Sequence, residues 1–64
     1  MNFYYKTRFN NRIIGYIFQE LPEQFPEDWT IGIGEANLIM TLPKVLFYLS
    51  NNYPGVKLEK VWEN

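Results

Sequence analysis

The chain has 64 residues, a formal net charge of −1, and neither cysteine nor histidine. These absences exclude disulfides, thiolate chemistry, haem ligation and the usual zinc sites, and the charge gives no overall attraction to nucleic acid or anionic lipid. Because 47% of the residues are hydrophobic, we expect a folded domain spanning 1–64. A core of this size rarely supplies more than ~3–5 kcal/mol, so self-association or a protein partner is expected to support the fold.

The first predicted element is a β-hairpin. The segments NFYYKTRF (2–9) and RIIGYIFQEL (12–21) are rich in strand-forming residues and flank Asn10-Asn11, and Asn tolerates the positive φ that a two-residue type I′ turn requires. If pairing runs one for one from Phe9 and Arg12, one face of the hairpin is the core face. That face carries Phe3, Tyr5, Phe9, Ile14, Tyr16 and Phe18. The opposite face carries Tyr4, Lys6, Arg8, Ile13 and Ile17.

The rest of the chain alternates turn signals with short periodic segments. Prolines and acids in 22–28 indicate a surface loop, 29–33 reads as a short third strand, and VKLEKVW (56–62) reads as a closing strand. Apolar residues at helical spacing predict a helix over 42–52, with Thr41 as its cap and Pro43 in its first turn. The conformation of 35–41 stays open. The predicted fold is therefore α+β, with an antiparallel sheet of three to four strands, one helix on one face and the order ββ(β)αβ.

The stretch Gly32-Ile33-Gly34 raises the question of a phosphate-binding loop. A dinucleotide fingerprint needs a third glycine where Asn37 stands. Glu35 would also place a carboxylate beside the phosphates, and no Gly-Lys-Ser/Thr follows. We therefore expect these glycines to shape a turn or to allow a close backbone approach.

No catalytic, cofactor-binding or metal-binding residue is predicted. Glu23, Glu27 and Asp28 lack the ordered spacing of a calcium loop, and Ser50, the one serine, has no base at an interpretable spacing. No small-molecule substrate is expected. The sequence predicts a protein that is not an enzyme.

The predicted functional surface is the second hairpin face. Tyr4, Lys6, Arg8, Ile13 and Ile17 combine aromatic, apolar and cationic groups, which are typical of interface centres. We therefore expect an interaction or regulatory protein that binds another protein or a second copy of itself. The size and the cysteine-free composition also fit a regulator or inhibitor encoded by a phage or mobile element.

An alternative function is single-stranded nucleic-acid binding. In that case Tyr4 would stack on a base, and Lys6 and Arg8 would contact phosphates. The single aromatic residue on this predicted face and the acidic chain favour this alternative less than the protein-binding hypothesis. A further possibility is that this face has no binding function and that the stems of Lys6 and Arg8 merely cover the isoleucines.

The segments GYIFQELPE and GEANLIMTLPKVLFYL loosely resemble the N-terminal half of small antitoxins of the HicB type. The resemblance covers about half of the chain and implies an antitoxin-like domain. The chain lacks the Pro-Asp-Leu-Pro-Gly signature of that family and has Glu20-Leu21-Pro22-Glu23 instead. With no apolar export signal and no apolar run of membrane-spanning length, the sequence predicts a cytoplasmic location without membrane association.

Overall fold

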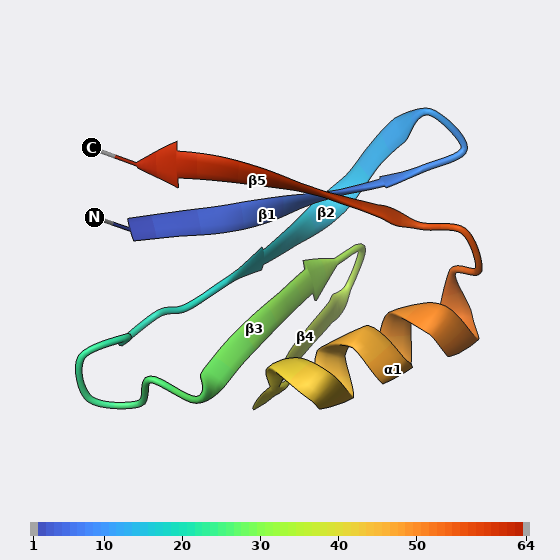
Figure 1. Ribbon diagram of the computed structural model, residues 1–64. Helices are drawn as coiled ribbons and strands as arrows, with labels where there is room; N and C mark the ends of the chain where they lie inside the picture. Colours follow the sequence, from blue (N-terminus) through green and yellow to red (C-terminus); the bar gives the residue numbers. More distant parts are fainter. Residues whose placement is uncertain (1, 64) are drawn as a thin grey trace.

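The computed structural model describes residues 2–63, which form a five-stranded antiparallel sheet and one helix (Figure 1). In chain order the elements are β1 (Asn2–Phe9), β2 (Arg12–Phe18), β3 (Asp28–Ile33), β4 (Ala36–Thr41), α1 (Leu42–Asn52) and β5 (Lys57–Glu63). The strands lie in the order β4-β3-β2-β1-β5, so the last strand returns to pair with the first. The α+β class is confirmed, but the sheet has five strands rather than three to four.

The turn between β1 and β2 has the predicted chemistry. Asn10 and Asn11 both adopt left-handed backbone conformations, with φ of 52° and 65°. Positive φ at both central residues is the requirement of the type I′ turn, whose twist matches that of the flanking strands. The hairpin and its two-residue loop are therefore confirmed.

A β-bulge changes the register of this hairpin. Arg8 pairs with Ile13 as expected, but the register then shifts, so that Thr7 pairs with Gly15 and Tyr5 with Ile17. Ile14 is the extra residue of β2. Because strand side chains alternate, a slip of one residue moves each later side chain to the other face.

The predicted faces of three β2 residues are therefore wrong. Ile17 is completely buried in the core, whereas Tyr16, which is 45% exposed, and the half-buried Phe18 lie on the opposite side of the sheet. Ile14 lies against the core as predicted. The cause is the bulge, which a one-for-one count from the turn does not include.

Residues 35–41 form a turn and a strand rather than part of the helix. Ile33 pairs with Ala36 across Gly34-Glu35, and Gly34 has a φ of 59°, a conformation that glycine adopts without steric cost. The turn-forming role expected for these glycines is thus confirmed at Gly34. The close backbone approach is found at Gly15 instead, where an added Cβ would collide with the carbonyl oxygen of Gly32 and lie 2.7 Å from Cγ1 of Ile33.

The helix α1 begins and ends where the sequence predicts. Thr41 is the N-cap residue, although its side chain makes no capping hydrogen bond, and Pro43 lies in the first turn. At the other end the Tyr53 N–H donates to the Leu49 carbonyl oxygen at 2.7 Å, and Gly55 has a φ of 86°. Both features are typical of a helix that ends in a turn.

The core lies between α1 and one face of the sheet. Its buried residues are Ile17, Trp29, Ile31, Ile33, Val45 and Leu49. Val45 and Leu49 are four positions apart and so share one helix face, which meets the alternating residues of β3. Figure 1 shows the helix beside the half of the sheet that contains β3 and β4. Within residues 2–63, no helix covers the opposite face.

Candidate functional site

The sheet face that α1 does not cover is called the open face here. Strand pairing and side-chain alternation place on it Tyr4, Lys6, Arg8, Ile13, Tyr16, Phe18, Ile39 and Val61. These residues come from four strands, including both edge strands. Ile13, Tyr16 and Ile39 are exposed, and Ile39 reaches 61%. The open face therefore presents apolar and aromatic groups over most of the width of the sheet.

Aromatic side chains form the middle of the open face. The rings of Tyr4 and Tyr16 meet edge to face, with 6.0 Å between their centroids and an interplanar angle of 63°. Phe18 lies two residues beyond Tyr16 on the same strand, and the three rings line a shallow hollow together with Gln19 and Glu63. Rings with phenolic hydroxyls at such a surface offer apolar area and hydrogen bonding together.

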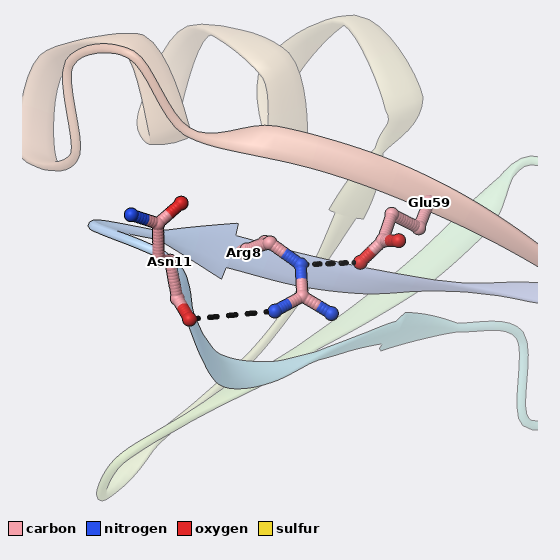
Figure 2. A network of polar contacts seen from close by, with 3 residues as sticks. All are labelled: Arg8, Asn11 and Glu59. Carbon is pink, nitrogen blue, oxygen red and sulfur yellow. Dashed lines mark hydrogen bonds and ion pairs between the residues drawn. The ribbon is translucent and has the colours of Figure 1, made fainter.

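Charges on the open face are balanced between neighbouring strands. Nε of Arg8 donates to Oε1 of Glu59 at 2.7 Å, and a second guanidinium nitrogen lies 3.4 Å from the Asn11 carbonyl oxygen (Figure 2). Lys6 pairs with the same glutamate across the β1–β5 ladder. Strand β5 thus places one carboxylate, that of Glu59, beside both predicted cations. It also adds Lys57 opposite Arg8 and Glu63 opposite Asn2, so the face carries little net positive charge.

A second apolar area adjoins the open face at β4. A hollow of about 190 Å³ lies between the 19–27 loop and the strands, lined by Glu20, Leu21, Phe25, Asp28, Thr30 and Ile39. Oγ1 of Thr30 donates to Oε1 of Glu20 at 3.3 Å, which joins the loop to β3. Leu21 and Phe25 are each 53% exposed, so this loop extends the apolar surface beyond the sheet.

Four of the five residues predicted as the partner-binding surface lie together. Tyr4, Lys6, Arg8 and Ile13 share the open face, whereas Ile17 lies in the core and cannot contact a partner. Sequence reasoning missed Tyr16 and Phe18 because of the bulge. It also missed Ile39 because no conformation was predicted for residues 35–41.

Residues considered for chemistry have ordinary surroundings. Across residues 2–63, no three carboxylates lie close enough to hold a metal ion. The Ser50 hydroxyl donates to the Leu46 carbonyl oxygen of its own helix at 2.9 Å. In the same range, no helix is both long and apolar enough to cross a membrane.

Comparisons with known proteins found no matching family model, no matching curated protein and no matching solved structure. The resemblance to HicB-type antitoxins therefore stays a prediction.

Proposed function

We propose that this chain is a non-enzymatic interaction or regulatory protein that binds another protein through the open face of its sheet. The observation that carries the proposal is the arrangement of Tyr4, Tyr16, Phe18 and Ile13 on the face that α1 does not cover. A contiguous apolar surface rimmed by polar groups is typical of a protein-binding site. The residues proposed for the site are Tyr4, Lys6, Arg8, Ile13, Tyr16 and Phe18.

The composition of the open face supports a protein partner. Tyrosine, phenylalanine and arginine are enriched at interface centres, where they supply large contact areas. Arg8 already has its carboxylate in Glu59, with the two side chains 38% and 48% exposed. A partner that buries this pair contacts a neutral unit rather than an unpaired charge. The pairing lowers the free-energy cost of removing the two side chains from water.

Single-stranded nucleic-acid binding remains the second candidate, including its antitoxin-like form. One observation favours it beyond the sequence: the bulge brings Tyr16 and Phe18 beside Tyr4, and several aromatics on a sheet are a stacking platform for bases. The carboxylates of Glu59 and Glu63 on the same face oppose phosphate binding. For this reason we rank a protein partner first.

The test begins with capture from lysate of the native host, with and without nuclease treatment. The tagged protein is compared with Ile13→Lys and Tyr16→Ala, which alter the open face at exposed positions. Phe47→Ala is the matched control because Phe47 is 70% exposed but lies on α1. We expect one discrete protein that survives nuclease, is lost with both open-face variants and is retained by the control.

Salt separates the two candidates. Phosphate contacts release counterions, so affinity for nucleic acid falls steeply with rising salt, whereas apolar docking changes little. If the captured material is nucleic acid, and Lys6→Ala lowers both its affinity and the salt slope, the second candidate replaces the first. Equal capture by the open-face variants and by Phe47→Ala contradicts both candidates.

A further inference from the structure

The two edge strands of the sheet differ sharply in charge. Strand β5 carries Lys57, Glu59, Lys60 and Glu63 among its seven residues. Strand β4 has the sequence ANLIMT, with no charge and no proline. Natural proteins protect free edges with charges, prolines or bulges because unpaired backbone groups attract another strand. By these criteria β5 is protected and β4 is not.

The edge of β4 is accessible along its middle. Asn37, Leu38 and Ile39 are three consecutive exposed residues, and consecutive side chains of a strand point to opposite faces. Exposure on both sides at once shows that α1 and the 19–27 loop leave the strand largely uncovered at these positions. Another strand can therefore approach it.

The turn before β4 determines which backbone groups point outward. A two-residue hairpin loop closes on a hydrogen-bonded pair, here Ile33 and Ala36. Such pairs alternate along an antiparallel ladder, so Ala36, Leu38 and Met40 direct their N–H and C=O groups to β3. Asn37, Ile39 and Thr41 direct theirs to the free edge. These three outward residues are spaced evenly about Ile39.

That spacing makes β4 complementary to itself. In an antiparallel pair with a two-fold axis at Ile39, the outward residues of one copy meet those of the other, so every outward donor faces an acceptor. Ile39 then lies opposite Ile39, Leu38 opposite Met40, and Asn37 opposite Thr41, so apolar residues meet apolar ones and polar meet polar. A shift by two residues loses this match, because it places Asn37 opposite Ile39 or opposite Pro43, which has no N–H.

We propose that the occupant of the β4 edge is a second copy of this chain, paired antiparallel about Ile39 to give one continuous sheet. The absence of charge means that identical strands meet without repulsion. The two-fold axis keeps both helices on one side of the joined sheet and both open faces on the other. This inference does not rest on the proposed function, because the partner-binding residues of β1 and β2 lie away from the axis.

Because the chain contains no cysteine, a single introduced cysteine tests the register directly. Ile39→Cys places two thiols at the axis, in a hydrogen-bonded pair with Cα atoms about 5.5 Å apart, a separation within the Cα range of disulfides. Ile13→Cys is the matched control, because a position two strands away from β4 keeps the two thiols on the order of 20 Å apart. Under mild oxidation we expect Ile39→Cys to give the covalent dimer at least about tenfold faster than Ile13→Cys. Equal rates overturn the proposed pairing.

The second test removes one outward N–H without losing a hydrogen bond inside the chain. Asn37→Pro is compared with Asn37→Ala, which keeps the N–H, by analytical ultracentrifugation over a concentration series, with circular dichroism to confirm folding. We expect the natural chain and Asn37→Ala to be dimers, and Asn37→Pro to dissociate at least about tenfold more readily. A natural chain that is monomeric at all concentrations, or a folded Asn37→Pro that dimerises equally well, overturns the inference.

Partner binding through the open face and dimerisation through β4 can be tested independently. Ile13→Lys is expected to lose the captured partner but to remain dimeric. Asn37→Pro is expected to become monomeric while each copy keeps its open face and binds the partner. Loss of dimerisation in Ile13→Lys with normal dimerisation in Asn37→Pro would place self-association on the open face and contradict the role of β4.

Discussion

The covered face and the open face of the sheet both carry many apolar side chains, yet only one of them forms a core. Ile17 and Ile31 are completely buried under α1, whereas Tyr16 and Ile39 stay exposed on the other side. Residues 2–63 contain one helix, which packs over the β3 and β4 part of one face, and the other face is left to solvent or to a partner. The comparison shows that position relative to α1, and not hydrophobicity, separates core residues from candidate binding residues.

The largest difference between the two faces is expected when one isoleucine on each face is truncated. Ile17→Ala opens a cavity in a closed site and is expected to lower the free energy of unfolding by about 2–5 kcal/mol. Ile13→Ala, at a residue 37% exposed, is expected to cost under about 1 kcal/mol. Urea unfolding followed by tryptophan fluorescence measures both. Equal losses would contradict the assignment of the two faces.

The second prediction concerns the close approach at Gly15. A methyl group there collides with the Gly32 carbonyl oxygen and lies 2.9 Å from the Ile33 Cα, so β2 and β3 must move apart. Gly15→Ala is expected to destabilise the fold by about 1–3 kcal/mol. Gly32→Ala is the control, because its nearest contact, the Phe18 ring at 3.7 Å, is an ordinary one. Thermal unfolding that ranks Gly32→Ala below Gly15→Ala in stability would contradict the geometry.

A smaller effect of opposite sign is expected at Thr7, which is completely buried on the covered face. Among the described residues its Oγ1 has no hydrogen-bond partner. Replacing an unsatisfied hydroxyl by a methyl group removes its desolvation cost, so Thr7→Val is expected to raise the free energy of unfolding by about 1 kcal/mol. Thr7→Ser keeps the hydroxyl, loses the methyl group and is expected to destabilise. A less stable Thr7→Val would show that the hydroxyl is satisfied in solution.

The smallest effect is expected for the ion pair on the open face. Arg8 and Glu59 are partly exposed, so water and salt screen their attraction and the coupling is expected to be about 0–1 kcal/mol. A double-mutant cycle with Arg8→Gln and Glu59→Gln isolates the coupling. A much larger value would make the pair a structural element of the fold rather than a neutral part of a binding surface.

Local signals in the sequence predicted several elements because local chemistry determines them. Asn10-Asn11 specified the first turn, and apolar spacing with Pro43 specified α1. Turn residues and alternation also indicated a loop over 22–28 and a closing strand over 56–62, which the structure places at 19–27 and at Lys57–Glu63. In each case the residues that set the structure are neighbours in the chain.

The errors arose where contacts between distant segments decide the outcome. The bulge at Ile14 lies directly beside the close contact of Gly15 with β3, and pairing counted along the hairpin includes neither feature. Because of that bulge, Tyr16 lies on the candidate surface and Ile17 lies in the core. Strand β4 was missed because its residues form a strand only through pairing with β3.

The most direct test of partner binding through the open face is the affinity of the captured partner for purified variants. Isothermal titration calorimetry measures this affinity at two salt concentrations. We expect Tyr16→Ala to weaken binding at least about tenfold, or 1.4 kcal/mol, at both concentrations, and Phe47→Ala to bind as the natural chain does. The opposite result, with binding lost in Phe47→Ala and unchanged in Tyr16→Ala, would move the binding site from the open face to α1.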